Sequence, residues 1–329
     1  MTRRAISLAR EPTERAVELG VDNLAALPAD WVHEHLGLGA VAPVYVRAWL
    51  VMSLADLGRF AEGAEYEAEA LQLAEPTHRP YTIGFAYRAA GMLHLLKGDW
   101  TQARSLTEQW MAAFRPGGIN LLAQAVIASA WVLALLGNVA EALDRLSEAK
   151  QLLQRLTRGV TGANHGWNSY ALGRACLLLG RLDEARQYGD RTVEASPLRP
   201  GIAAYALHLL GDIATYSDCF DAARGEAHYR QALALAEPRG MRPLVAHCHL
   251  GLGKLARRAG KREQAREHFT TAITMYRGMD MQFWCEQVEA EAGPRAQPQL
   301  RSDRGVPGSV SRAGAGKGID RVPRSRTYC

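Results

Sequence analysis

The sequence predicts an all-α protein, a right-handed α-solenoid of about six helix pairs with a period of about 40 residues. Ala, Leu, Glu and Arg dominate the 329 residues, whereas Val and Ile are sparse, and this composition favours helix over strand. A glycine followed within a few residues by Glu-Ala, or by a similar pair, recurs along the chain. Between these glycines, apolar residues follow helical spacing, as at Leu172, Cys176 and Leu179.

The recurring glycine marks the turn inside each predicted pair, because glycine readily adopts the left-handed conformation that ends a helix. It occurs at Gly58, Gly98, Gly137, Gly180 and Gly260. Successive intervals are 39 to 43 residues, except for the last, which is 80 and spans two periods. A degenerate unit fills this double interval, with Gly211 in its first helix, Ala232 in its second and an altered turn near 217–220.

Small residues on both sides of the turn would let the two helices of a pair pack closely. Seven residues before the glycine lie Val51, Gly91, Ala130, Gly173 and Gly253. Five residues after it lie Gly63, Ala103, Ala142, Ala185 and Ala265. A single pair cannot bury its apolar stripe alone, so the stacking of successive pairs would complete the core.

The units divide the chain into three parts. Residues 1–40 are expected to form an incomplete N-terminal helical unit, because PTERAVELGVDNLAAL resembles a second helix without its first. Residues 41–290 form the repeat array. Residues 291–329 are rich in Gly, Pro, Ser and Arg and have no apolar periodicity, so we expect a disordered basic tail.

The positive charge is concentrated in that tail. The chain has a formal net charge of +5, and residues 293–329 contain eight Lys or Arg against two Asp. The helical body is therefore close to neutral and lacks the excess of basic residues typical of a nucleic-acid-binding domain. The alternative is a helical-repeat nucleic-acid-binding or transcription-regulatory module that uses the basic tail.

The repeated pattern resembles the tetratricopeptide repeat (TPR). A large residue and then an alanine follow the turn in the second helix, with large residues at Leu146, Tyr229 and Phe269 and alanines at Ala70, Ala149, Ala232 and Ala272. Trp110 and Thr192 replace the alanine in two units. The period exceeds the standard repeat of about 34 residues, and in this it is similar to the longer repeats of large bacterial signalling ATPases.

A narrower resemblance covers roughly residues 13–290. The last unit, which contains HCHLGLGKLARRAGKREQAREHFTTAITMYRGMDMQFWCEQVEAE, looks like the end of bacterial proteins that join a nucleotide-cyclase-like domain, an AAA-type ATPase and a helical-repeat tail. The resemblance implies a regulatory tail, or a fragment of one, that binds a protein or peptide partner. An upstream ATPase or cyclase module is one such partner.

The catalytic and nucleotide-binding motifs of that family are not found in this sequence. Gly253-Lys254 and Gly260-Lys261 are not phosphate-binding loops, because both lack the earlier glycine and the following Ser or Thr that such a loop requires. The HCH stretch at 247–249 lacks the i, i+4 spacing of helical metal ligands. We therefore expect no catalytic residues, no metal and no cofactor, and hence no enzyme.

The remaining sequence features indicate a cytoplasmic protein. The five cysteines form no C-x-x-C pair and are expected to be reduced thiols. The first residues, MTRRAISLAREPTER, lack the apolar segment of a signal peptide. The apolar stretch LLAQAVIASAWVLALLG is interpreted as a helix buried inside the array, although its length approaches that of a membrane span.

These observations favour a non-catalytic scaffold for protein or effector binding. In solenoids the first helices line the concave surface, and aromatic residues interleaved with cations are enriched at binding hot spots. The predicted groove residues are Phe85, Arg88, Trp131, Trp167, Tyr170, Arg174, Tyr205, His208, His247, Lys254 and Arg257, with Tyr45, Met52, Met92 and Asp212 beside them. The alternative is that many of them pack against neighbouring helices.

Overall fold

The structure is a computed structural model that describes residues 13–28, 34, 39–116, 119–156, 165–216 and 220–292. Within these ranges the chain forms α-helices and short 3-10 helices, and no strand. The predicted disordered tail from residue 293 onward, most of the altered turn at 217–220 and much of residues 1–40 lie outside the described residues.

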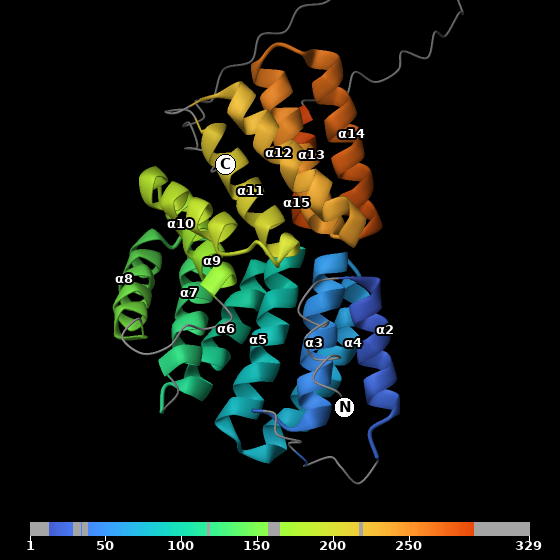
Figure 1. The fold of residues 1–329 in the computed structure, drawn as a ribbon, viewed down its shortest axis with the longest axis vertical. Helices are drawn as coiled ribbons and strands as arrows, with labels where there is room; N and C mark the ends of the chain where they lie inside the picture. Colours follow the sequence, from blue (N-terminus) through green and yellow to red (C-terminus); the bar gives the residue numbers. More distant parts are fainter. Residues whose placement is uncertain are drawn as a thin grey trace, which may run out of the picture.

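The six predicted helix pairs are present and stack in chain order (Figure 1). They are α3 (Ala42–Leu57) with α4 (Phe60–Ala74), α5 (Pro80–Lys97) with α6 (Trp100–Phe114), α7 (Ile119–Leu135) with α8 (Val139–Leu156), α9 (His165–Leu178) with α10 (Leu182–Glu194), α11 (Pro200–Ala214) with α12 (Ala222–Ala236), and α13 (Arg242–Arg258) with α14 (Arg262–Gly278). A single helix, α2 (Glu14–Ala25), packs on α3 before the array, and α15 (Gln282–Ala292) packs on α14 after it. Two 3-10 helices, η2 (Glu75–Thr77) and η4 (Glu237–Arg239), follow α4 and α12.

The glycine turns are confirmed. Gly58 and Gly98 end α3 and α5 with φ of 75° and 100°, and the predicted glycines of three other turns also have positive φ. Glycine adopts this left-handed region without the steric cost that a Cβ would add. The turns therefore reverse the chain within two or three residues and hold the two helices of each pair side by side.

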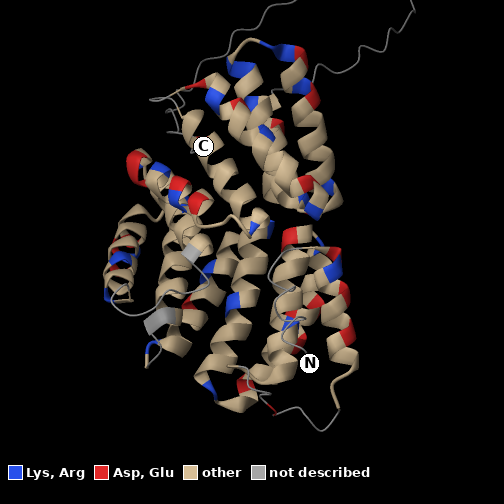
Figure 2. Ribbon diagram, viewed as in Figure 1, with Lys and Arg blue, Asp and Glu red and all other residues tan. Residues whose placement is uncertain are grey.

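The first and second helices of the pairs have different roles in the core. First helices such as α3, α5 and α11 are buried on most of their faces. Second helices bury one stripe, which on α8 is Ala142, Leu146, Ala149 and Leu152. Figure 2 shows charged residues gathered on outer helices such as α8 and α10. The first helices thus form the inner layer, which is where a binding surface is expected.

The array curves until its last helices contact its first ones, which the sequence analysis did not anticipate. Helix α13 contacts α3, and Figure 1 shows α11 to α15 seated against the ends of α3 and α5. Lys97 Nζ lies 2.9 Å from Asp280 Oδ2, and the rings of Trp100 and Phe283 lie 4.2 Å apart. We call these contacts the ring closure, since they join the two ends of the array.

The ring of Tyr229 fills a space that exists because Gly211 and Gly251, which lie against it, have no side chains. A Cβ added at Gly251 would lie 2.6 Å from Tyr229 Cε1, whereas one added at Gly91 would meet nothing closer than 3.4 Å. Gly251→Ala is therefore expected to destabilise the fold by about 1–2 kcal/mol through overpacking. Gly91→Ala, the control, is expected to be neutral or stabilising by up to about 1 kcal/mol. Urea denaturation measures both, and equal effects would contradict the prediction.

Candidate binding site

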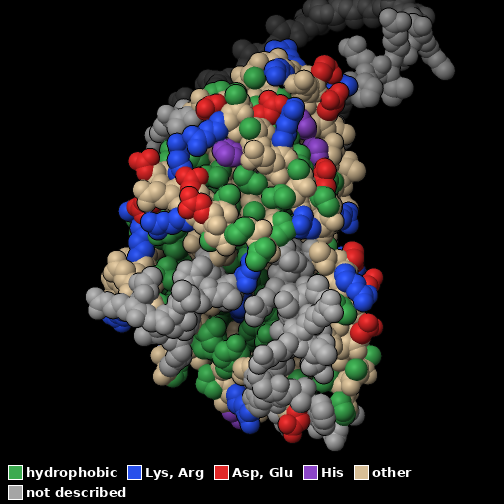
Figure 3. All heavy atoms as spheres, in the orientation of Figure 1, with side chains coloured by type: hydrophobic (Ala, Val, Ile, Leu, Met, Phe, Trp, Pro, Cys, Tyr) green, Lys and Arg blue, Asp and Glu red, His purple; other side chains and the backbone are tan. Residues whose placement is uncertain are grey.

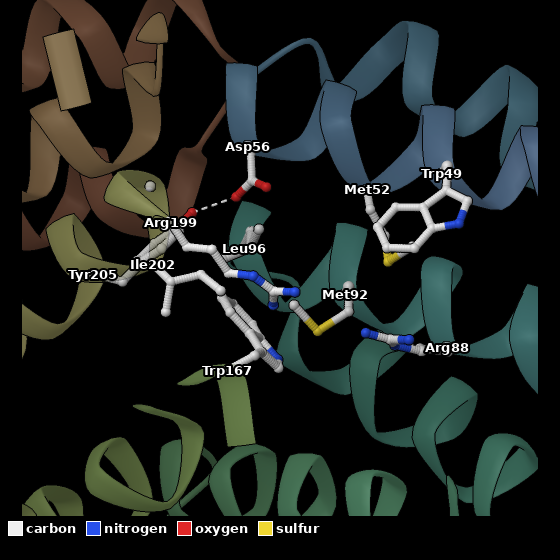
Figure 4. A pocket seen from close by; sticks show the side chains of 11 residues that line it. Trp49, Met52, Asp56, Arg88, Met92, Leu96, Trp167, Arg199, Ile202 and Tyr205 are labelled. Atoms are coloured by element: carbon white, nitrogen blue, oxygen red, sulfur yellow. Dashed lines mark hydrogen bonds between the residues drawn. The ribbon is translucent and has the colours of Figure 1, made fainter. Parts of the chain in front are cut away.

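An open pocket with an empty volume of about 750 Å³ lies among the first helices α3, α5, α9 and α11, and we call it the central pocket. Its apolar lining consists of Trp49, Met52, Met92, Leu96, Trp167 and Ile202. Its polar lining consists of Asp56, Arg88, Arg199 and Tyr205, with Gly201 completing the wall. In Figure 3 the middle of the molecule is hollowed, with hydrophobic and basic side chains inside the hollow. Figure 4 shows the lining side chains converging from helices of four different repeats.

A hydrogen bond between distant repeats fixes one side of the central pocket. The Tyr205 hydroxyl on α11 donates to Asp56 Oδ1 on α3 over 2.6 Å (Figure 4). Burial and the adjacent Asp56 carboxylate raise the pKa of Tyr205 well above its usual value. The phenol therefore keeps its proton at neutral pH and remains a donor, so the bond holds α3 and α11 together.

Arg88 is the most unusual residue of the pocket lining. It is only 9% exposed, and its guanidinium lies 5.8 Å from the Phe85 ring and 6.0 Å from the Trp110 ring. In the described part of the chain no carboxylate forms an ion pair or hydrogen bond with it. Burial lowers the pKa of Arg88, but a guanidinium stays protonated in proteins. Its contacts with the rings offset only part of the cost of burying this charge.

Aromatic side chains form a continuous layer behind the pocket. Trp167 lies 5.5 Å from Tyr205 and 6.4 Å from Trp131, measured between ring centroids. Trp131 and Tyr170 are both buried, as is Phe85, whose ring lies 6.0 Å from that of Trp49. These three predicted groove residues therefore support the pocket wall from within the core.

A buried charge network lies next to this layer. Arg174 on α9 forms an ion pair with Asp212 on α11, and the Tyr229 hydroxyl donates to Asp212 Oδ1 over 2.7 Å. His208 Nε2 lies 3.7 Å from the same carboxylate. Burial opposes ionisation of Asp212, but the charges of His208 and Arg174 and hydrogen bonds from Tyr229 and Arg174 prevail and lower its pKa to about 2. Arg174 and His208 are thus already engaged within the protein.

Helix α15 covers the last part of the inner layer. His247 Nδ1 is hydrogen-bonded to Tyr276 Oη over 2.6 Å, and its ring lies 4.4 Å from that of Trp284. Lys254 and Arg257 both pair with Glu291 of α15. Burial, together with the charges of His208 and Arg174, lowers the pKa of His247 well below its usual value, so this imidazole is neutral at pH 7.

Comparison with known proteins identifies the repeats. The model of the tetratricopeptide repeat matches residues 124–197 and 202–278. This chain contains tetratricopeptide repeats. No curated protein matches the sequence. The match covers the units from α7 to α14, and the structure extends the same arrangement of helix pairs to α3–α6.

Two solved structures are similar to this TPR array over most of its length. One is a chain of the APC/C hetero-tetramer Cut9–Hcn1, with a TM-score of 0.55, 16% identity and coverage of 86% of this chain and 47% of that chain. The other is a STAND signal-transduction ATPase with a TPR sensor from Pyrococcus horikoshii, with a TM-score of 0.52, 14% identity and coverage of 89% and 43%. This chain spans less than half the length of either protein, and at these identities the likeness shows the fold alone.

The structure brings three of the eleven predicted groove residues of the TPR array to the central pocket, namely Arg88, Trp167 and Tyr205. The sequence analysis missed Trp49, Asp56, Leu96, Arg199 and Ile202. A signal for three of them was available, because Trp49, Asp56 and Leu96 each lie four residues from a named position on the same helix. Arg199 and Ile202 lie at the start of α11, where helical register gives less information.

The histidines and cysteines singled out in the sequence lie apart from the central pocket in the part of the array that is described. Within those residues no three His, Cys, Asp or Glu side chains are placed to hold a metal. His249 of the HCH stretch lies against His268, with their Nδ1 atoms 3.0 Å apart. Cys176, Cys248 and Cys285 are free thiols. No described helix is both long enough and apolar enough to cross a bilayer.

Proposed function

We propose that this TPR protein is a cytoplasmic, non-catalytic binding scaffold whose inner layer takes up a partner protein or an effector at the central pocket. The observation that carries the proposal is the pocket itself, where side chains of four repeats converge on an open space with apolar walls and a buried arginine. TPR arrays generally bind protein partners. Concave pockets with mostly apolar walls and a few polar groups are the usual form of a binding site.

We further propose that the scaffold is the regulatory tail of a signalling ATPase or cyclase, either as part of the same chain or as a separate subunit. Two observations support this role. The sequence resembles such tails over roughly residues 13–290, and a STAND ATPase with a TPR sensor has a similar fold. In this role, occupation of the central pocket would change the activity of the attached enzyme.

The test is affinity capture with the full chain and quantitative identification of the captured proteins. Trp167→Ala and Met52→Gln remove apolar lining of the central pocket, and Val139→Ser on the outer helix α8 is the control, because Val139 is 42% exposed. We expect an ATPase or cyclase that is captured by wild type and by the control but is depleted with both pocket variants. Circular dichroism checks that the variants fold. Identical captured sets for all four proteins would contradict the proposal.

A further inference from the structure

We propose that the central pocket binds a small-molecule monocarboxylate with an aromatic or similarly apolar body, and that Arg88 holds the carboxylate. The inference rests on the proposed binding role of the pocket and adds the chemistry of the ligand. It is carried by the position of Arg88, by the pattern of paired and unpaired cations on the inner layer, and by the walls and size of the pocket.

Arg88 lines the pocket while more than nine-tenths of its surface is removed from solvent. Figure 4 shows its guanidinium beside Met92 and below Trp49, at the edge of the open space. Burying a charge without an opposite partner is unfavourable. A guanidinium presents parallel N–H groups that match the two oxygens of a carboxylate. A bound carboxylate would therefore supply the ion pair that the described residues do not provide for Arg88.

The other cations predicted for the inner layer are already paired. Arg174 is bonded to Asp212, and Lys254 and Arg257 share Glu291. Among the four predicted groove cations, Arg88 is thus the one without a carboxylate in the described residues. This contrast places anion recognition at the central pocket and not along the whole inner layer.

The walls indicate what the rest of the ligand is like. Trp49 and Trp167 present aromatic surface from α3 and α9, and such surfaces pack well against flat apolar groups. Met52 and Met92 also line the pocket, and methionine adapts its shape to irregular ligands. The body of the ligand is therefore apolar, with aromatic rings favoured.

The charge and size of the central pocket restrict the class of ligand further. The lining contains two arginines and one aspartate, a net charge of +1, which matches a monoanion better than a phosphate dianion. The open space of about 750 Å³ includes the part that is continuous with bulk solvent, so a small molecule can enter it from outside. An extended peptide would need further unpaired cations along the inner layer, but Lys254 and Arg257 already pair with Glu291 of α15.

The experiment compares acids with their neutral amides. The full chain is titrated by calorimetry with phenylacetate, indole-3-acetate and benzoate, and with phenylacetamide, indole-3-acetamide and benzamide. We expect at least one acid to bind about tenfold or more tightly than its amide, as a charge-assisted pair with arginine would give. Arg88→Gln should abolish this preference and leave amide binding unchanged, while Arg88→Lys should retain part of it. Arg104→Gln, at an exposed ion pair with Glu141, is the control and should behave as wild type.

The remaining outcomes separate this inference from the proposed function. If acid and amide bind equally and Trp167→Ala weakens both, the pocket binds small molecules but Arg88 does not recognise a carboxylate, and this inference is wrong. If none of the six probes binds while partner capture still depends on Trp167, the pocket takes a protein segment and the small-molecule inference is wrong. If no probe binds and pocket variants leave capture unchanged, both proposals fail. Should Arg88→Gln not fold, the ratio of acid to amide affinity in Arg88→Lys decides the question.

Discussion

Replacing Trp284 by alanine is expected to lower the free energy of unfolding by about 3–5 kcal/mol and to open the ring closure. Trp284 belongs to α15 but lies between the two ends of the array. Its ring is 4.4 Å from His247 and 6.1 Å from Trp100 of α6, and a Cβ added at Gly98 would lie 2.9 Å from its Nε1. Loss of the indole would leave a cavity that both ends line, so the contact between them should weaken.

Two measurements separate ring opening from simple destabilisation. Urea denaturation gives the loss of stability, and small-angle X-ray scattering gives the radius of gyration of the native state. Phe269→Ala is the matched control, because Phe269 packs against Gly253 within a single helix pair. It should cost a similar free energy without expanding the molecule. If Trp284→Ala leaves the radius of gyration equal to that of Phe269→Ala, the ring closure does not depend on this side chain.

Asp212→Ala is expected to destabilise the protein by about 3–5 kcal/mol at pH 7, because it leaves the charge of Arg174 buried without its partner. The same change removes the acceptor of the Tyr229 hydroxyl, whose hydrogen bond measures 2.7 Å. Asp212→Asn keeps the shape and one acceptor oxygen, so its cost should be smaller. Urea denaturation at pH 7 measures both variants. A cost for Asp212→Ala no larger than that of an exposed ion-pair variant such as Glu141→Ala would contradict the prediction.

The pH dependence of stability gives an independent test of Asp212. Its pKa is about 2 in the folded protein, against an ordinary value of 3.8 for an aspartate. Because the folded pKa is the lower one, the carboxylate stabilises the fold above about pH 4, and this contribution is lost as the pH falls towards 2. The difference between the two pKa values corresponds to about 2 kcal/mol in the free energy of unfolding. Asp212→Asn should reduce the change in the free energy of unfolding between pH 4 and 2. An unchanged slope would show that other carboxylates cause the loss of stability in acid.

The helix pairs could be predicted from the sequence because their determinants are local. Gly58 and Gly98 end helices through their own backbone conformation, and small residues such as Ala103 mark the crossing within a pair. The ring closure could not be predicted in this way. It depends on the rotation from each pair to the next, summed over six pairs, and small differences in side-chain size change that sum.

The candidate site was predictable only in part, for a related reason. Helical spacing places Arg88, Trp167 and Tyr205 on the inner layer, and the structure finds them at the pocket. Spacing alone cannot show which inner residues meet a later helix. Lys254 and Arg257 have the same periodicity as Arg88, but both pair with Glu291 of α15. The position of that helix follows from tertiary packing and not from the repeat.

The contacts that join the two ends of the array also change how the molecule should unfold. An open array of repeats loses structure from its termini, because a terminal repeat has one neighbour and an internal repeat has two. Here the contact between α13 and α3 gives the first and last repeats a second neighbour. The Lys97–Asp280 and Trp100–Phe283 contacts join the second repeat to the same end of the array. Amide hydrogen exchange in α3 and α13 should therefore be nearly as slow as in α7 and α9. The array would then open as one cooperative unit, without the graded fraying of a linear solenoid.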